Sequence, residues 1–209
     1  HQGTWLAPPW LRDHTVSAWI GPLCNHKSVT QRTDPDPTKL DVKLVDPVNG
    51  AVSNPPPRMV VGISGASGVI YGVRMLDALR DLGVESHLVV SRAALLTLSQ
   101  ETDFSADDLS ARADVTHRLA DVGASIASGS FKTMGMVIAP CSVRTMGEIA
   151  SGVTSSLLTR AADVTLKERR RLVLMVRETP FHLGHLRTMT ALTEMGAVIA
   201  PPLPALYAR

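Results

Sequence analysis

The sequence predicts an α/β protein, a Rossmann-like (flavodoxin-like) three-layer sandwich built around a mostly parallel sheet. Three observations lead to this fold class. From residue 58 onward, short apolar runs alternate with segments that repeat apolar residues at helical spacing. The first apolar run is followed at once by a glycine-rich turn and a helical pattern, as in a βα unit. Aromatic residues make up only 4% of the 209 residues, so the core must be aliphatic.

Each expected strand is a short run of apolar residues bounded by turn residues or charges. The run 172–176 is wholly apolar, which is typical of a strand that a parallel sheet buries on both faces. The strands alternate with helices, so right-handed βαβ crossovers are expected throughout. The expected strands are 59–63, 84–91, 136–139, 172–176 and 197–200.

Helices are expected where apolar residues recur three or four positions apart. Val69, Val73 and Leu76 set this pattern in the first helix, which ends before Gly83. Residues 103–129 are polar and irregular, and we expect only a short helix and loops there. The expected longer helices are 69–82, 92–100, 143–151, 155–168 and 182–195.

Residues 1–57 differ from the rest of the chain. They hold nine of the fourteen prolines and all three tryptophans, and they show neither the strand nor the helix period. This composition predicts a Pro-rich, disordered N-terminal extension, followed by one domain over 58–209. A docking arm onto a neighbouring subunit is the alternative.

The composition excludes several classes of function. The formal net charge is +2, so nothing calls for a nucleic-acid partner, and no apolar run is long enough for a membrane span. Cys24 and Cys141 cannot build a disulfide framework, which favours a reducing, cytoplasmic location. His182 and His185 lie three apart, but no acid or Cys completes a ligand set, so no metal site is expected.

The polar stretches of the domain follow the ends of its expected strands. Parallel strands bring their carboxyl ends to one edge, where open α/β sheets bind ligands. The stretches expected to converge there are 65–68, 91, 141–145, 177–178 and 207.

The glycine-rich turn is the first of these stretches. Residues 62–68 contain three glycines and two serines, directly before a helix. Free N–H groups at that helix N-terminus, together with the hydroxyls of Ser64 and Ser67, suit an anion such as a phosphate. The alternative is an ordinary βα turn in which small residues allow close packing.

Two further stretches offer groups for chemistry. Arg177 suits a phosphate or carboxylate, and Glu178 beside an apolar strand suits proton transfer, unless the two form a structural ion pair. The turn 142–145 opens a helix and could hold a flavin ring edge or a phosphate, unless Ser142 is only an N-cap. Cys141 has no His near it in sequence, so we interpret it as a small buried thiol.

One helix carries cations on a single face. Arg160 and Lys167 are seven residues apart, and 169–171 is a run of three arginines, which an exposed helix end would also explain. Glu101 and Asp103 lie at the C-terminal end of another expected helix, where negative charge interacts unfavourably with the helix dipole. Acids at this position indicate a functional or interface role.

Several of these motifs together resemble the flavin prenyltransferases, the UbiX/Pad family, whose members were formerly described as aromatic-acid decarboxylases. The resemblance runs in order from about residue 58 to the end of the chain. It is carried by Gly-Ile-Ser-Gly-Ala-Ser-Gly at 62–68, Gln-Glu-Thr-Asp at 100–103, Ala-Ser-Gly-Ser-Phe at 127–131, Met-Val-Ile-Ala-Pro-Cys-Ser at 136–142, Arg-Ala-Ala-Asp-Val at 160–164, Leu-Lys-Glu-Arg-Arg at 166–170 and Arg-Glu-Thr-Pro at 177–180.

The resemblance implies a metal-independent transferase. It would join the dimethylallyl group of dimethylallyl monophosphate to reduced FMN, and the prenylated FMN would serve a UbiD-type decarboxylase. It also implies a homo-oligomer, a dodecamer with sites between subunits, so that Arg160 and Lys167 act in a neighbour's site.

The same resemblance assigns roles to individual residues. Glu178 would be the acid–base residue, Ser67 would relay protons and Glu101 would line the site. The FMN phosphate is expected over the glycine-rich turn 65–68. Residues implied in FMN binding are Gly65, Ala66, Ser67, Ser91, Ser142, Val143, Arg144, Thr145 and Arg177. Residues implied in binding the prenyl phosphate are Arg160, Lys167, Arg177 and Tyr207.

One departure from the family pattern concerns the C-terminus. That pattern continues past Tyr207 with a further basic residue and a terminal helix, whereas this chain stops at Arg209. A flavoprotein domain over 58–209 that is truncated at its C-terminus is therefore expected, with FMN binding retained and weak prenyl transfer. The alternatives are an FMN-dependent decarboxylase of the cysteine-decarboxylase type, which the Arg-Glu-Thr-Pro motif disfavours, and a non-catalytic FMN-binding subunit.

Overall fold

The computed structural model describes residues 56–203. The N-terminal extension expected over 1–57 lies outside the described residues, apart from its last two positions. The expected C-terminal truncation and Tyr207 also lie outside them. Within the described part, no helix has the length and apolar character needed to cross a bilayer.

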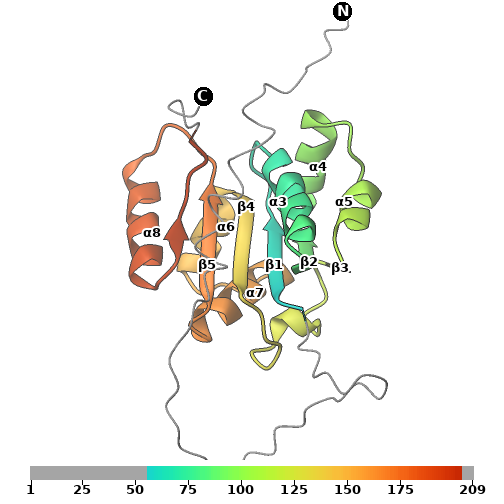
Figure 1. The fold of residues 1–209 in the computed structure, drawn as a ribbon. Helices are drawn as coiled ribbons and strands as arrows, with labels where there is room; N and C mark the ends of the chain where they lie inside the picture. The colour runs from blue at the N-terminus through green and yellow to red at the C-terminus, as the bar shows by residue number, and fades with distance from the viewer. Residues whose placement is uncertain (1–55, 204–209) are drawn as a thin grey trace, which may run out of the picture.

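The centre of the fold is a six-stranded sheet in which every neighbouring pair is parallel (Figure 1). The strand order is β3-β2-β1-β4-β5-β6, which is the order of a Rossmann fold. This confirms the predicted α/β class. The strands are β1 (Arg58–Ile63), β2 (Glu85–Val90), β3 (Val115–His117), β4 (Gly135–Cys141), β5 (Arg171–Val176) and β6 (Val198–Ile199).

The edge strand β3 was expected to be loop. It has three residues, Val-Thr-His, and pairs only with β2, so it carries no apolar run that could reveal it in the sequence. The five strands that were expected would by themselves have the flavodoxin-like order, and the addition of β3 converts this to the Rossmann order. In both orders the chain reverses direction across the sheet between β1 and β4.

Helices cover both faces of the sheet, which makes the predicted three layers. On one face, α3 packs Val73, Leu76 and Leu79 against β1, and α4 and α5 extend this layer toward β3. On the other face, α6, α7 and α8 pack against β4 and β5. The helices are α3 (Ile70–Asp81), α4 (Arg92–Glu101), α5 (Ala106–Arg112), α6 (Val143–Ala150), α7 (Leu157–Lys167) and α8 (Leu183–Glu194), with a short 3₁₀ helix η1 (Ser125–Ala127).

A close contact brings α3 onto the sheet. A Cβ atom at Gly72 would lie 2.5 Å from the carbonyl oxygen of Ala139 and 2.6 Å from Cδ1 of Ile63. Only a residue without a side chain fits between α3 and the ends of β1 and β4. This contact therefore fixes the distance between the first turn of α3 and the carboxyl ends of β1 and β4.

Candidate active site

A cavity of about 840 Å³ opens at the carboxyl edge of the sheet. The segments that follow β1, β2, β3, β4 and β5 all contribute to its wall. This is the edge at which the sequence predicted convergence, and the cavity includes the crevice between β1 and β4 where the strand order reverses.

Ser64 joins the two loops on either side of this crevice. Its side chain is fully buried, and its Oγ donates to the carbonyl oxygen of Pro140 at 3.0 Å. The same Oγ accepts from the N–H of Ser142 at 2.7 Å. The backbone N–H of Ser64 also donates to Pro140, at 3.2 Å. The turn after β1 and the turn after β4 are thus linked directly.

The glycine-rich turn contacts the start of α4. A Cβ atom at Gly65 would lie 2.3 Å from Cβ of Ala93, so the close approach of the turn to α4 requires glycine. Gly65, Ala66 and Ser67 line the cavity, as the family resemblance implied for the flavin site.

The N-terminus of α3 was expected to offer free N–H groups to a phosphate over 65–68, but a carboxylate of the chain itself occupies two of them. The N–H groups of Gly68 and Val69 donate to Oε2 of Glu101, at 2.8 and 3.2 Å. Glu101 was expected to line the site, but it is not among the residues that line the cavity. Its carboxylate lies at the positive end of α3, which explains why an acid is tolerated at the C-terminal end of α4.

Three other helices begin at the cavity, and each has a serine N-cap. Ser91 accepts from the N–H of Ala94 at 3.1 Å, and Ser142 accepts from the N–H of Thr145 at 3.2 Å. Ser156 caps α7. An N-cap satisfies only some of the first-turn N–H groups of its helix, and the remaining ones favour an anion. The cavity-lining residues from these first turns include Arg92, Ala93, Val143, Arg144, Leu158 and Thr159.

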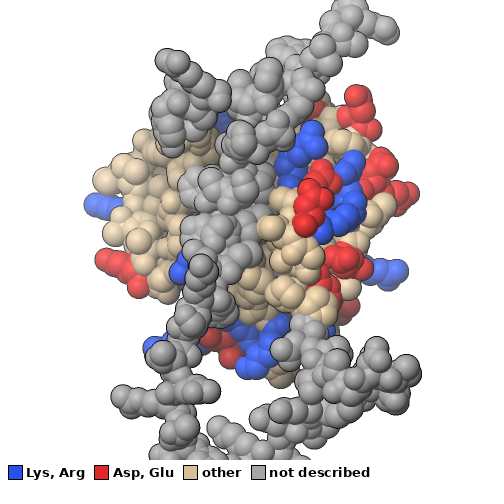
Figure 2. Space-filling model, in the orientation of Figure 1, with Lys and Arg blue, Asp and Glu red and all other residues tan. Residues whose placement is uncertain are grey.

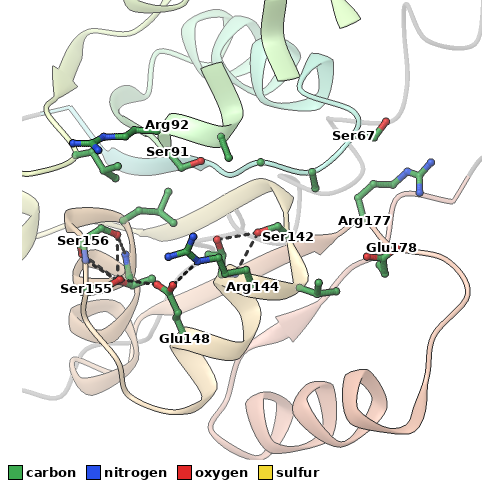
Figure 3. Close-up of a pocket in the computed structure, with 18 of the residues that line it drawn as sticks. Ser67, Ser91, Arg92, Ser142, Arg144, Glu148, Ser155, Ser156, Arg177 and Glu178 are labelled. Atoms are coloured by element: carbon green, nitrogen blue, oxygen red, sulfur yellow. Dashed lines mark hydrogen bonds and ion pairs between the residues drawn. The ribbon is translucent and has the colours of Figure 1, made fainter. Parts of the chain in front are cut away.

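Ser67, Arg177 and Glu178 lie at one end of the cavity (Figure 3). The backbone N–H of Arg177 donates to the carbonyl oxygen of Cys141 at 3.0 Å, which positions the segment after β5 beside the end of β4. Oε1 of Glu178 accepts from the N–H of Thr179 at 3.0 Å. Among residues 56–203 there is no ion pair between Arg177 and Glu178. The structural ion pair considered from the sequence is therefore wrong, and both side chains can act on a ligand.

A second carboxylate in the cavity, Glu148, was missed in the sequence. It pairs with Nε of Arg144 at 2.9 Å and accepts from Oγ of Ser155 at 2.8 Å (Figure 3). The hydrogen bond from Ser155 and that from Arg144 lower the pKa of Glu148. The i, i+4 spacing of Arg144 and Glu148 was the available signal. Ser155 and Ser156 were also missed, although a serine directly before a helical pattern, as at Ser156, is an N-cap signal.

Arg160 and Lys167 do not line this cavity. Arg160 pairs with Asp163 at 2.8 Å, and Lys167 pairs with Glu168 at 2.5 Å. Lys167 ends α7 just before β5 begins, so it lies at the amino-terminal edge of the sheet, opposite the cavity. Arg160, by contrast, directly follows the cavity-lining residue Thr159 near the start of α7.

Cys141 is a buried thiol, as predicted. Burial raises its pKa to about 12, so it is not a nucleophile at neutral pH. His182 caps α8, and its ring lies tilted by 30° against that of His185, with ring centroids 3.6 Å apart. Over residues 56–203, no group of three or more His, Cys, Asp or Glu side chains is arranged to bind a metal ion.

A histidine pair anchors β3, whose end leads to the cavity-lining residues Leu119 and Ala120. Nε2 of His87 lies 2.8 Å from Oε1 of Glu85, and Nδ1 of His87 lies 3.0 Å from Nε2 of His117. Glu85 accepts from His87, which leaves Nδ1 of His87 to accept from His117. Burial, then the charge of His87, lowers the pKa of His117, and Asp121 opposes this in part.

This geometry predicts that acid destabilises the fold. Because the pKa of His117 is lower in the folded state than in the unfolded chain, the unfolded chain binds more protons, and the free energy of unfolding falls as the pH drops below about 6.5. The thermal midpoint should therefore be lower at about pH 5.5 than at about pH 7.5. His117→Gln keeps a donor for His87 and should reduce this difference. An identical pH dependence in the variant would assign the loss to other groups.

An all-parallel Rossmann-type sheet, with three helix N-termini around a cavity at the reversal of the strand order, defines a nucleotide- or flavin-phosphate-binding α/β protein. Comparison with known proteins makes the class specific. The Flavoprotein family matches residues 49–207. The flavin prenyltransferase UbiX of Escherichia coli K12 is 64% identical over 153 residues, which cover 73% of this chain and 81% of that protein.

Two crystal structures are also similar. AnUbiX in complex with FMN and dimethylallyl pyrophosphate superposes with a TM-score of 0.73 at 48% identity, over 73% of this chain and 81% of that one. A dodecameric FMN-dependent UbiX-like decarboxylase from Escherichia coli O157:H7 gives a TM-score of 0.71 at 48% identity, over 72% and 82%. The chain belongs to the flavin prenyltransferase (UbiX) family, which is a family of transferases.

Proposed function

We propose that this chain binds FMN in the cavity and transfers a dimethylallyl group from dimethylallyl monophosphate to reduced FMN. The observation that carries the proposal is the joint presence of an acid, a cation and a serine at one end of a cavity that is otherwise surrounded by helix N-termini. The 64% identity to a flavin prenyltransferase supports the reaction class.

The residues present fit FMN. A volume of about 840 Å³ is within the range of about 300–1,000 Å³ found for ligand sites. Ser91 and the first turn of α6, from Ser142 to Thr145, offer hydroxyls and N–H groups for the FMN phosphate. Gly65, Ala66 and Ser67 allow the flavin ring to approach the backbone, and Arg177 would hold its edge.

The side chains at this end of the cavity supply what prenyl transfer needs from the protein. Reduced FMN, when bound, supplies the electron-rich ring that accepts the allylic carbon. Arg177 would neutralise the charge that develops on the phosphate as the allylic C–O bond breaks. Glu178 would accept the proton released at flavin C6, and Ser67 would relay protons. Glu101 would act by holding the start of α3 through Gly68 and Val69.

A second copy of the chain would complete the site. Neither Arg160 nor Lys167 lines the cavity of its own chain, and Lys167 lies at the far end of α7, so we propose that both bind the prenyl phosphate in a neighbour's cavity. Tyr207, outside the described residues, would contribute to the same phosphate site. The dodecameric relative supports assembly as a homo-oligomer, and we propose a dodecamer. The prenylated FMN would be consumed by a UbiD-type decarboxylase.

Mass spectrometry of the flavin tests this function. After anaerobic incubation of the chain with reduced FMN and dimethylallyl monophosphate, the flavin is expected to carry one added prenyl group. Omission of the prenyl phosphate is the control and should leave FMN unchanged. Release of carbon dioxide from a peptidyl-cysteine substrate without a flavin adduct would favour the cysteine-decarboxylase alternative. If neither product is formed, the chain would be a non-catalytic FMN-binding subunit.

A further inference from the structure

The first turn of α6 carries a positive side chain at the end of the helix where the dipole is already positive. Arg144 is the second residue of α6, and that turn holds no acid. Its partner Glu148 lies four residues later, toward the negative end of the helix. A pair in this order is less favourable on a helix than the reverse order. The placement of Arg144 therefore points to an anionic ligand and not to the stability of α6.

The two partners of this ion pair differ in exposure. Only 21% of the Glu148 side chain is exposed, whereas 86% of the Arg144 side chain is. An ion pair with one partner so exposed contributes little to the free energy of folding, because water screens it. Glu148 is thus the fixed partner, and Arg144 is the one that a ligand can reach.

Other ion pairs of the chain lie on the outer surface. On the face shown in Figure 2, acidic and basic side chains are interspersed over α3 and α5, where Arg74 and Arg112 both pair with Asp77. None of these three residues lines the cavity. Arg144 and Glu148 both line it, so their charges face whatever the cavity binds.

Glu148 is fixed by a second contact, from the segment between α6 and α7. Oγ of Ser155 donates to Oε2 of Glu148 at 2.8 Å, and Nε of Arg144 donates to Oε1 at 2.9 Å. Both carboxylate oxygens are therefore used. The bond from Ser155, then that from Arg144, lowers the pKa of Glu148, so the carboxylate stays ionised at neutral pH.

Arg144 keeps donors for a ligand. Within residues 56–203, its only hydrogen bond is the one from Nε to Glu148, and its two Nη atoms are not used. In Figure 3 the guanidinium extends from α6 into the cavity. The paired N–H groups of a guanidinium match the oxygens of a phosphate. Since Glu101 already occupies two N–H groups of α3, the first turn of α6 is the better place for that phosphate.

We propose that Glu148 is a positioning residue for FMN binding: supported by Ser155, it holds Arg144 by Nε, so that the Nη atoms of Arg144 bind the flavin phosphate. The resemblance to the flavin prenyltransferases implied Arg144 in the flavin site, but it gave Glu148 and Ser155 no role. The inference rests on the proposed function in taking FMN as the ligand, and it is independent of prenyl transfer.

The affinities of the full chain for FMN and for riboflavin, which lacks the phosphate, test this role by fluorescence titration. Arg144→Gln is expected to raise the Kd for FMN about ten-fold, the scale of one charge-assisted hydrogen bond, and Glu148→Gln about three-fold. The Kd for riboflavin should not change in either variant. Arg74→Gln and Glu194→Gln make the same changes of charge at residues that do not line the cavity, and they should leave the Kd for FMN unchanged.

The double variant Arg144→Gln/Glu148→Gln gives the sharper test. Once Arg144 is replaced, the carboxylate of Glu148 faces the phosphate without a neighbouring cation and repels it. Adding Glu148→Gln to Arg144→Gln is therefore expected to tighten FMN binding, although Glu148→Gln alone weakens it. This change of sign requires that Glu148 acts through Arg144. A further loss of FMN affinity in the double variant would overturn the proposal.

A merely structural role of Glu148 would give a different pattern. Glu148→Gln would then lower the thermal midpoint and weaken FMN and riboflavin by the same factor, and this result would also overturn the proposal. Ser155→Ala should change the Kd for FMN in the same direction as Glu148→Gln.

The proposed function and this inference fail in different ways. A chain that binds FMN with the expected pattern of variants but forms no prenyl adduct would overturn the function and leave the role of Glu148 intact. A chain that forms the adduct while Glu148→Gln leaves the Kd for FMN unchanged would overturn the inference alone.

Discussion

Glu178→Gln is expected to slow prenyl transfer by about 10²-fold or more, while FMN affinity changes little. Glutamine keeps an oxygen that accepts from the N–H of Thr179, so the local structure is retained. It cannot accept a proton, and general acid–base catalysis of this kind contributes about 10²–10⁴-fold to rates. Single-turnover formation of the prenylated flavin measures the rate, and fluorescence titration measures FMN affinity.

The other carboxylate of the cavity provides the contrast. Glu148 is tied to Arg144 and Ser155, and these hydrogen bonds lower its pKa, so it is a poor proton acceptor. Glu148→Gln is expected to weaken FMN binding more than it slows the chemical step. If Glu178→Gln lost FMN affinity and rate in equal measure, Glu178 would be a binding residue and not the acid–base residue.

Gly72→Ala is expected to destabilise the fold by about 1–3 kcal/mol, the usual cost of overpacking. The added Cβ would overlap the carbonyl oxygen of Ala139, which belongs to the backbone of β4 and cannot turn away. For a protein of this size, the thermal midpoint should fall by about 2–4 °C per kcal/mol. Thermal unfolding followed by circular dichroism measures it.

Gly147→Ala is the matched control for Gly72→Ala. Gly147 is also a helical glycine, but an added Cβ would meet no atom within 4 Å. Alanine is favoured over glycine in a helix by about 1 kcal/mol, so this variant should be slightly more stable than the parent chain. Equal destabilisation by both substitutions would contradict the steric explanation.

The sequence predicted those parts of the fold that a long periodic pattern encodes. The apolar runs at 59–63 and 172–176 are buried strands, and the helix expected over 69–82 is α3. The strand β3 could not be predicted, because its three residues are held by pairing with β2 and not by apolar burial. The capping of α3 by Glu101 was also hidden, because it joins residues that are 33 positions apart.

The candidate site was predictable where its residues follow a strand directly. Ser67, Ser91, Ser142, Arg177 and Glu178 do so, and all of them line the cavity. Glu148, Ser155 and Ser156 lie beyond the first turn of α6 or at the start of α7, so their distance from any strand end concealed them. The roles proposed for Arg160 and Lys167 would depend on contacts between chains, which no pattern within one chain can encode.

The buried hydroxyl of Ser64 has a consequence for the kinetics of ligand capture. It joins the turn after β1 to the turn after β4, so neither can shift without breaking a buried hydrogen bond of the other. A flavin that contacts one turn therefore finds the other already in its binding position. Little conformational entropy should be lost on association, and the on-rate should be limited by diffusion and orientation instead of by loop rearrangement.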